Sequence, residues 1–317
     1  MKIILDTDIG SDCDDAVCLA YLLLRDDCDL LGVTTVGPNA ATRANIVRKL
    51  CQHFGRPDIA VLPGASQPLL PNPYWPGHHV NQHTILDQPD DRPDDPPPAD
   101  AVDFLRRAIH QNPGEVVLLT VGPATNAGLL AMTDPPAMAD LQALYAMGGR
   151  FHQPQGHAPR GECNAMLDPA AFAAILAAPT PKTFIAGVEV TGKTSLSRPQ
   201  VQSIFAGDRL AIIRDCVHAC ALGFGKDLEH AGTGMHDPFT AACIFHPEFA
   251  PTTRQGRAAV RFQHEDFNGK REFTPEQVTG HTPFHEDPRG PHLLAGSADV
   301  PAYHQHVDEV FARARLG

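Results

Sequence analysis

A short apolar strand followed at once by a cluster of aspartates constrains this chain more than any other feature. The run Lys2–Leu5 leads directly into DTDIGSDCDD, and then into the helical pattern AVCLAYLLLR. In a parallel sheet, ligands bind in the loop that follows the carboxyl end of a strand. Five carboxylates in one loop repel one another unless a cation or hydrogen bonds compensate. The sequence therefore predicts a ligand site, and more narrowly a cation site, after the first strand.

Helix capping explains only part of this cluster. Asp14 or Asp15 at a helix start is favourable without any metal, because a carboxylate there accepts hydrogen bonds from free N–H groups. Asp6 and Asp8 alternate at the strand end with a glycine behind them, and capping does not account for them. Oxygen ligands without a neighbouring histidine are typical of Ca²⁺ or Mg²⁺ sites. The pattern favours a hard divalent cation over purely structural aspartates.

Short apolar runs alternate with helical patterns along the chain, which predicts an α/β fold with a mostly parallel central sheet flanked by helices. The expected strands are Lys2–Leu5, Leu30–Val36, Ile59–Leu62, Val116–Val121, Ala143–Met147, Thr183–Val190 and Ala258–Phe262. The expected helices are Asp14–Arg25, Ala41–Phe54, Ala99–Gln111, Pro169–Ala177, Arg209–Phe224, Asp237–Phe245 and Ala302–Leu316.

Two stretches lack a clear hydrophobic period. Residues 70–100 join a Pro/His/aromatic segment to PDDRPDDPPPAD, and such a stretch is either a binding loop over the site or a solvated linker. Residues 264–295 are interpreted as an irregular insertion. Neither stretch has the composition of a domain boundary, so we expect residues 1–317 to form a single domain.

Charge and composition narrow the class of partner. The formal net charge is −12, which disfavours binding to nucleic acids or to anionic membranes. No apolar run is long enough to span a bilayer, and the first residues turn acidic too soon for a signal peptide. The eight cysteines include no CxxC pair, so free thiols in a reducing cytoplasm are expected.

Beyond this physical pattern, the first loop resembles a known family. DTDIGSDCDDAVCLAYLL is similar to the N-terminal signature DxDPGxDDA of the inosine–uridine nucleoside hydrolases. Each further block is weak alone, but their shared order over most of the chain is specific. These blocks are VGPN at Val36–Asn39, LPGASQPL at Leu62–Leu69, LTVGPATN at Leu119–Asn126, MGG at Met147–Gly149, GECN at Gly161–Asn164 and MHDP at Met235–Pro238.

The resemblance implies a nucleoside hydrolase-like fold with a Rossmann-like core. It also implies Ca²⁺-dependent hydrolysis of the N-glycosidic bond of ribonucleosides, giving ribose and free base, by a cytoplasmic homo-oligomer, either a dimer or a tetramer. The implied Ca²⁺ ligands are Asp8, Asp15, Asp237 and the backbone carbonyl of Thr125. Asp8 would also activate the attacking water.

The resemblance assigns the substrate contacts as well. His236 would donate a proton to the leaving base, and the ribose hydroxyls would be held by Asp14, Asn39, Glu162 and Asn164. Developing positive charge on the sugar is stabilised by nearby anionic groups, and a histidine suits proton donation near neutral pH.

Simpler structural roles stand beside these assignments. Asp168-Pro169 and Asp237-Pro238 both fit a helix N-cap followed by proline at the first helical position. Thr125 can likewise cap a helix, and a single histidine such as His236 is more often structural. It is the joint occurrence of these residues with the first loop that favours the functional interpretation.

The chain departs from the family pattern at three places. The first loop is two residues longer, with Ile9 where proline is typical and Asp12 as an extra carboxylate. An asparagine that contacts the sugar 5′-hydroxyl in the family is replaced by Gly156 or His157. The segment that approaches the base is replaced by PYWPGHHVNQH. There, His79 is the candidate base contact among side chains that either stack on the base or pack the loop, namely Tyr74, Trp75, His78, His79 and His83.

Two other functions fit parts of the sequence. A haloacid-dehalogenase-type Mg²⁺ phosphatase also has a strand followed by DxD, whose first aspartate is the nucleophile. Asp6-Thr7-Asp8 fits that pattern minimally, with Asp6 as the nucleophile. A non-catalytic nucleoside- or sugar-binding relative would explain the altered 5′ and base regions. The blocks GPATN and MHDP have no place in the phosphatase, and the proposed metal and water ligands are all present, so the hydrolase is favoured.

Overall fold

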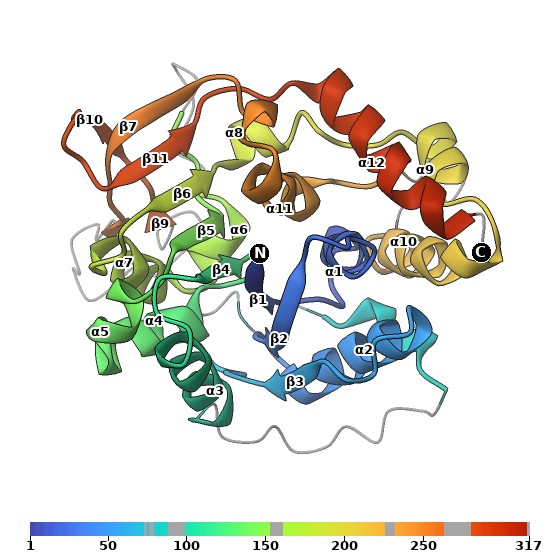
Figure 1. Cartoon of the computed structure of the whole chain (residues 1–317), viewed down its shortest axis with the longest axis horizontal. Coiled ribbons are helices and arrows are strands. Elements are labelled where there is room, and N and C mark those ends of the chain that lie inside the picture. Colours follow the sequence, from blue (N-terminus) through green and yellow to red (C-terminus); the bar gives the residue numbers. More distant parts are fainter. Residues whose placement is uncertain are drawn as a thin grey trace, which may run out of the picture.

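The computed structural model is an α/β fold built on a nine-stranded central sheet (Figure 1). It describes residues 1–72, 75, 79–87, 99–152, 161–225, 232–262 and 280–315. The strand order is β10-β7-β11-β6-β5-β4-β1-β2-β3. The strands of this sheet are β1 (Lys2–Thr7), β2 (Asp29–Thr35), β3 (Ala60–Pro63), β4 (Val116–Thr120), β5 (Ala143–Met147), β6 (Thr183–Ala186), β7 (Thr253–Ala258), β10 (Phe284–Glu286) and β11 (His292–Ala295), while β8 (Arg261–Phe262) and β9 (Gly280–His281) form a separate pair.

Helices cover both faces of the sheet (Figure 1). The α-helices are α1 (Asp14–Leu23), α2 (Ala40–His53), α3 (Ala99–His110), α4 (Thr125–Thr133), α5 (Pro135–Ala139), α6 (Cys163–Leu167), α7 (Pro169–Ala177), α8 (Val188–Thr191), α9 (Arg198–Ile204), α10 (Ala211–Gly223), α11 (His236–Phe245) and α12 (Val300–Arg315). Short 3₁₀ turns lie at Asn81–Ile85, Asp208–Leu210 and Pro247–Phe249. None of the helices in the described part of the chain is long and apolar enough to cross a membrane.

Alternate residues of the central strands enter different cores. Ile3 and Leu5 of β1 pack into a core with α1, α2, α10, α11 and α12. Ile4 between them packs into a second core with α3, α4, α5 and α7. Successive side chains of a strand point to opposite faces, so a sheet buried on both sides needs an uninterrupted apolar run. This is why KIIL has no polar residue at its centre.

The strand order places a crevice beside β1. From β11 to β3 every neighbouring pair is parallel, and the chain extends the sheet first from β1 through β2 to β3, then from β4 through β5 to β6. The order therefore reverses between β1 and β4. Ligands of open α/β sheets bind outside the carboxyl ends of the strands at such a reversal. The aspartate loop follows β1 at this point.

The predicted α/β class, mostly parallel sheet and flanking helices are confirmed, with three local corrections. The strand expected over Ala258–Phe262 is not one element, because Ala258 ends β7 and Arg261–Phe262 form β8, which pairs with β9 outside the main sheet. The strand expected over Thr183–Val190 ends at Ala186, because Gly187 begins the short helix α8. The range 264–295 was predicted to be irregular, but its described part, residues 280–295, supplies β9, β10 and β11. β11 pairs with β6 on one side and β7 on the other, so these residues extend the main sheet.

Candidate functional site

A buried arginine holds the loop that follows β1. Arg43 of α2 is fully buried, and its guanidinium donates to the carbonyl oxygens of Asp8 and Ile9, the latter at 3.0 Å. It also donates to Ser11 Oγ at 3.0 Å and to the Pro38 carbonyl at 2.9 Å. A planar group with five N–H donors can satisfy several oxygens at once. The loop conformation is therefore set by a residue of the next helix.

Three carboxylates from two distant parts of the sequence meet at this loop. Asp14, Asp15 and Asp237 each offer an oxygen atom, and these atoms all lie within 4.8 Å of one another. Asp14 accepts backbone hydrogen bonds at the start of α11, from His236 N at 3.0 Å and Asp237 N at 3.4 Å. Thr7 Oγ1 at the end of β1 donates to Asp15 Oδ1. The cluster is built from β1, α1 and α11.

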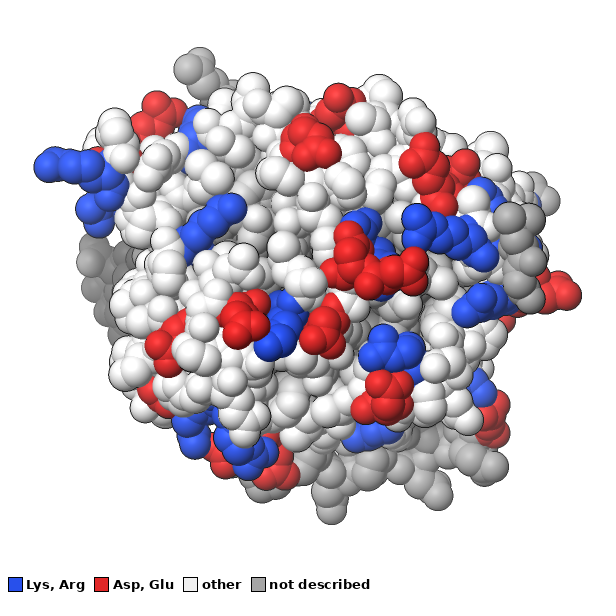
Figure 2. All heavy atoms as spheres, in the orientation of Figure 1, with Lys and Arg blue, Asp and Glu red and all other residues white. Residues whose placement is uncertain are grey.

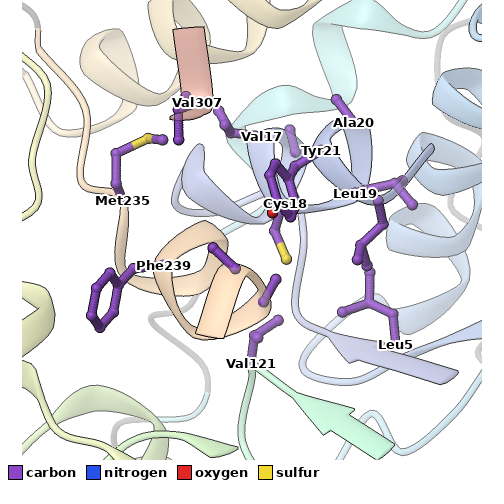
Figure 3. Packing of buried hydrophobic residues seen from close by; sticks show 14 of the residues in the cluster. Leu5, Val17, Cys18, Leu19, Ala20, Tyr21, Val121, Met235, Phe239 and Val307 are labelled. Carbon is purple, nitrogen blue, oxygen red and sulfur yellow. The ribbon is translucent and has the colours of Figure 1, made fainter. Parts of the chain in front are cut away.

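Apolar packing fixes these helices against each other. Figure 3 shows the core around α1, where Cys18 of α1, Val121 after β4 and Phe239 of α11 are among the contributing side chains. All three are at most 2% exposed. A close-packed interior tolerates little displacement, so the carboxylates at the helix starts are held in place before any ligand binds.

Burial makes this cluster electrostatically unfavourable when empty. Burial raises the pKa of Asp14 to about 6, with His236 opposing the shift and Asp12 adding to it. The pKa values of Asp15 and Asp237 lie well above the usual range, first because of burial and then because of repulsion from Asp8 and Asp14 respectively. A bound divalent cation reverses this, since it favours the ionised carboxylates. The all-oxygen donor set is the one that hard cations prefer.

The carboxylates open into a cavity of about 210 Å³. Asp8 lies at its base, where Gly122 leaves room: a Cβ at that position would be 2.8 Å from Asp8 Oδ1. The cavity is lined by Asp8, Asp12, Asp14, Asp15, Val121, Met147, Arg150, Gly161, Glu162, Cys163, Asn164, Val188, His236 and Asp237. Most of the residues predicted from the sequence thus share one cavity.

Glu162 and Asn164 form a second polar wall. The Glu162 carboxylate caps α6, accepting from Asn164 N at 2.8 Å, Ala165 N at 3.1 Å and Gly149 N at 2.8 Å. Burial nevertheless raises its pKa. Asn164 Nδ2 donates to the carbonyl oxygen of Val121 at 2.6 Å. These bonds fix both side chains at the cavity surface, where they can meet a hydroxylated ligand.

His236 is the first residue of α11 and faces the same cavity. Its Nδ1 lies 2.8 Å from Thr191 Oγ1. This contact orients the ring, and the other ring nitrogen remains for a ligand. A histidine held beside buried carboxylates in a cavity suits proton transfer.

Thr125 is not among the described residues that line the cavity, whereas Val121, directly after β4, is. The Thr125 hydroxyl donates to Asp168 Oδ2 at 2.8 Å, and Asp168 caps α7 by accepting from Ala171 N at 3.0 Å. Asp168 is therefore structural, as its position before proline suggested. The described lining on this side of the cavity is thus Val121, four residues before Thr125.

Asn39 and His79 also lie outside the described cavity lining. Asn39 precedes α2 in the left-handed region, with φ 60°, the only non-glycine residue with positive φ in the described chain. His79 is exposed. Trp75 is buried and donates Nε1 to the Ser66 carbonyl at 2.6 Å, so it packs its own loop. Tyr74, His78, Gly156 and His157 lie outside the described residues.

Asp6 stabilises the elements around the site through buried hydrogen bonds. It is fully buried, accepts from Thr34 Oγ1 at 2.6 Å and Asn126 Nδ2 at 2.8 Å, and burial raises its pKa to about 7. Asn126 Oδ1 in turn accepts from Ala65 N at 2.8 Å. The network ties β1 to β2, to the loop after β3 and to the start of α4.

The sequence interpretation missed Arg43, Val121, Arg150 and Cys163. Cys163 stands inside the matched block GECN, and Arg150 directly follows MGG, so both could have been examined there. Arg43 gave no signal, because an arginine in an amphipathic helix is usually solvated. Val121 is an apolar residue at the end of an expected strand, and that pattern indicates core packing and not a cavity wall.

Comparison with known proteins agrees with this geometry. The family model for inosine-uridine preferring nucleoside hydrolases matches residues 3–300. This chain belongs to that family. The family consists of metal-dependent N-glycosyl hydrolases, and the chain is therefore an enzyme of this class.

Individual members of the nucleoside hydrolase family are distant from this enzyme in sequence. It is 29% identical to a non-specific ribonucleoside hydrolase of Salmonella paratyphi C, covering 99% of this chain and 98% of that one. It is 26% identical to a probable uridine nucleosidase of Oryza sativa subsp. japonica, covering 83% and 82%. The structure of a purine-preferring ribonucleoside hydrolase from Gardnerella vaginalis superposes with TM-score 0.80 at 20% identity, covering all of both chains.

Proposed function

We propose that this enzyme hydrolyses the N-glycosidic bond of ribonucleosides in a Ca²⁺-dependent reaction that yields ribose and free base. One observation carries the proposal: buried oxygens of Asp14, Asp15 and Asp237 converge within 4.8 Å beside the strand reversal. Such a cluster is stable in its ionised form only with a cation. The oxygen donors fit Ca²⁺, and the adjoining polar cavity fits a sugar.

The proposed ligands differ from the sequence assignment at one position. Asp15 and Asp237 of this cluster would hold the ion together with Asp8, which lines the same cavity, and with the carbonyl oxygen of Val121 in place of that of Thr125. Asp14, the third carboxylate of the cluster, would face the sugar. Val121 lines the cavity and its carbonyl points to Asn164, another lining residue, whereas the Thr125 hydroxyl is engaged by Asp168. When bound, a divalent cation orients water and lowers its pKa.

Asp8 is the proposed base. It lies in the cavity beside the cluster and is 6% exposed, so its carboxylate can take a proton from water held there. The water oxygen then bonds to the anomeric carbon as the bond from that carbon to the base nitrogen breaks. The sugar passes through a state with oxocarbenium character, which the surrounding carboxylates stabilise.

His236 is the proposed acid for the leaving base. Protonation of the departing nitrogenous base avoids expelling an anion, and the ring oriented by Thr191 faces the cavity for this purpose. Between turnovers, His236 regains a proton from solvent and Asp8 releases its proton to solvent.

The ribose hydroxyls would be bound by polar side chains of the cavity. Asp14, Glu162 and Asn164 line the cavity and offer oxygens and an amide to ribose hydroxyls. Asn39 and His79 lie outside the cavity lining and stay in the proposal as groups that approach a bound substrate. Several fixed polar partners favour a ligand with hydroxyls over one without them.

The phosphatase alternative fits the geometry poorly. A phosphoaspartate mechanism needs Asp6 at the substrate, but Asp6 is fully buried, engaged by Thr34 and Asn126, and absent from the cavity lining in the described chain. A non-catalytic binding role would require loss of the metal or water ligands, and those proposed here are present. We further propose a cytoplasmic dimer or tetramer.

A nucleoside panel with and without chelator tests the proposal. Release of reducing sugar from inosine, adenosine, uridine and cytidine is measured with Ca²⁺, with Mg²⁺ and with excess chelator. Hydrolysis that disappears with chelator and returns with Ca²⁺ supports the proposal. Full activity in chelator, or tight nucleoside binding without any turnover at saturating Ca²⁺, contradicts it.

A further inference from the structure

Arg150 is the one lysine or arginine among the described residues that line the cavity. It follows Gly149 after β5, and its backbone is fixed by reciprocal bonds to a buried threonine. Arg150 N donates to Thr282 Oγ1 at 2.7 Å, while the Thr282 hydroxyl donates to the Arg150 carbonyl at 3.0 Å. Thr282 is 1% exposed. The backbone that carries the Arg150 guanidinium is therefore fixed at the cavity wall.

The Arg150 side chain has no ion-pair partner among the described residues. Its Nε is buried and has no hydrogen-bond partner, and its guanidinium makes no ion pair with any carboxylate of the described ranges. Glu189, whose charge it influences, accepts instead from Phe151 N at 3.2 Å. A partly desolvated, unpaired guanidinium is unfavourable. An anionic ligand in the cavity would supply its missing partner.

The rest of the cavity limits where that anion can lie. The aspartates of α1, of α11 and of the loop after β1 would repel it, so it must point away from the metal cluster and toward the wall after β5. In a bound ribonucleoside, C1′ must face Asp8, the base must face His236 and the ring hydroxyls must face the polar groups. The 5′ carbon is the remaining substituent, and phosphate is the anion it ordinarily carries.

We propose that the enzyme accepts ribonucleosides bearing a 5′-phosphate, with the Arg150 guanidinium bound to the phosphate oxygens. A guanidinium matches two phosphate oxygens at once, in two parallel charge-assisted hydrogen bonds. The inference rests on the proposed N-glycosidic hydrolysis and names its substrate class. The products would then be ribose 5-phosphate and free base, with the same bond cleaved and the phosphate ester left intact.

The test compares matched substrates. The kcat/KM of inosine 5′-monophosphate is measured against that of inosine, and that of uridine 5′-monophosphate against that of uridine, in wild type, Arg150→Gln, Arg150→Lys and Arg313→Gln. Arg313 is a matched control, since it forms a surface ion pair with Asp26 and its side chain is 66% exposed. Calorimetric binding of ribose 5-phosphate, ribose and inorganic phosphate gives a second readout.

We expect the nucleotides to be the better substrates of wild type. Arg150→Gln should lower the nucleotide-to-nucleoside ratio of kcat/KM by roughly 10- to 100-fold, the range for losing hydrogen bonds to a charged group. Arg150→Lys keeps the charge but cannot form two parallel hydrogen bonds, so its nucleotide-to-nucleoside ratio should lie between those of wild type and Arg150→Gln. Arg313→Gln should match wild type. Ribose 5-phosphate should bind more tightly than ribose, and only while Arg150 is present.

The possible negative results distinguish failure of the phosphate site from failure of the hydrolase proposal. Hydrolysis of nucleosides without any preference for nucleotides, or an equal loss on both in Arg150→Gln, overturns the phosphate site and leaves the hydrolase proposal intact. Arg150-dependent preference for orotidine over uridine, without gain for uridine 5′-monophosphate, assigns the arginine to a carboxylated base and also overturns it. If neither nucleosides nor nucleotides are hydrolysed but ribose 5-phosphate binds only when Arg150 is present, the hydrolase proposal alone is refuted. If there is neither hydrolysis nor binding of ribose 5-phosphate, the hydrolase proposal and the phosphate site are both refuted.

Discussion

At the scale of single residues, Asp8 carries most of the proposed chemistry. Its carbonyl is held by Arg43, its carboxylate lies against Gly122, and it lines the cavity beside the carboxylate cluster. The position is thus fixed by α2 and by the loop after β4. The side chain can be changed without disturbing the backbone contacts that hold the loop.

Replacing Asp8 by asparagine removes a proton acceptor and a metal ligand of nearly the same shape. We expect kcat for nucleoside hydrolysis to fall by about 1000-fold or more, because both general-base and metal contributions are lost. The thermal midpoint of the metal-free protein should change little or rise, since one repelling charge is gone. Steady-state kinetics and thermal unfolding measure the two; near-normal turnover would sink the mechanism.

Arg43 should matter for stability as well as for activity. Arg43→Met keeps the length of the side chain but leaves the buried carbonyls of Asp8 and Ile9 without donors. We expect the free energy of unfolding to fall by about 3 kcal/mol or more. Arg48→Met on the same helix, where the side chain is exposed, should cost less than about 1 kcal/mol. Urea denaturation compares the two, and equal losses would contradict this role.

At the scale of elements, the longer helices were predicted better than the short helices and than strands β10 and β11. The patterns for α1, α2, α3, α7, α10, α11 and α12 agree with the structure within a few residues, because each buries an apolar face. The short helices α4, α6 and α8 follow strands and present few turns, so they gave no periodic signal. Strands β10 and β11 were missed because β-sheet pairing, not local pattern, defines them.

The junction of α1 with α12 gives a test at this scale. His306 Nε2 lies 2.9 Å from Tyr21 OH and 3.0 Å from Arg25 Nη1. Burial, with the nearby charges of His246 and Arg25, lowers the pKa of His306 from 6.5 to about 4. A proton on His306 would face the Arg25 guanidinium. The folded junction therefore requires a neutral imidazole.

The unfolded chain takes up a proton on His306 near pH 6.5, whereas the folded chain does so only near pH 4. Stability from this group is therefore complete above pH 6.5 and is lost as the pH falls toward 4. His306→Asn, which cannot titrate, should flatten part of the decline of the thermal midpoint over that window. His53→Asn, at the solvent-exposed end of α2, is the control. Identical pH profiles for His306→Asn and wild type would refute this.

At the scale of the whole molecule, the metal cluster couples distant segments. Asp15 lies near the start of the chain and Asp237 in its last third, yet their carboxylates share one site with Asp14. Acidic and basic side chains are mixed over the face seen in Figure 2, so the strongest concentration of one sign that we describe is this buried one. Folding without a cation leaves that repulsion unrelieved.

Adding Ca²⁺ should therefore stabilise the entire fold. At a free concentration about 100 times the dissociation constant, the gain is about 2.7 kcal/mol, seen as a higher thermal midpoint that chelator reverses. Asp237→Asn should lose most of this response, because one ligand charge is gone. Asp299→Asn, at the exposed start of α12, should keep it. A midpoint indifferent to Ca²⁺ and chelator in wild type would rule out the metal site.

The sequence by itself determined the α/β class, the first-loop aspartates and the family, because apolar periodicity and local carboxylate spacing are written in consecutive residues. It also placed Asp8, Asp14, Asp15, Glu162, Asn164, His236 and Asp237 in one site through the order of the family blocks, and all of them line one cavity. Only the tertiary structure decided that Val121 and not Thr125 is among the described residues lining the cavity, that Arg43 holds the loop and that Arg150 lines the same cavity with its buried Nε unpartnered. Those facts depend on which strand end, helix and buried group meet across the sheet, and such long-range contacts leave no spacing to read.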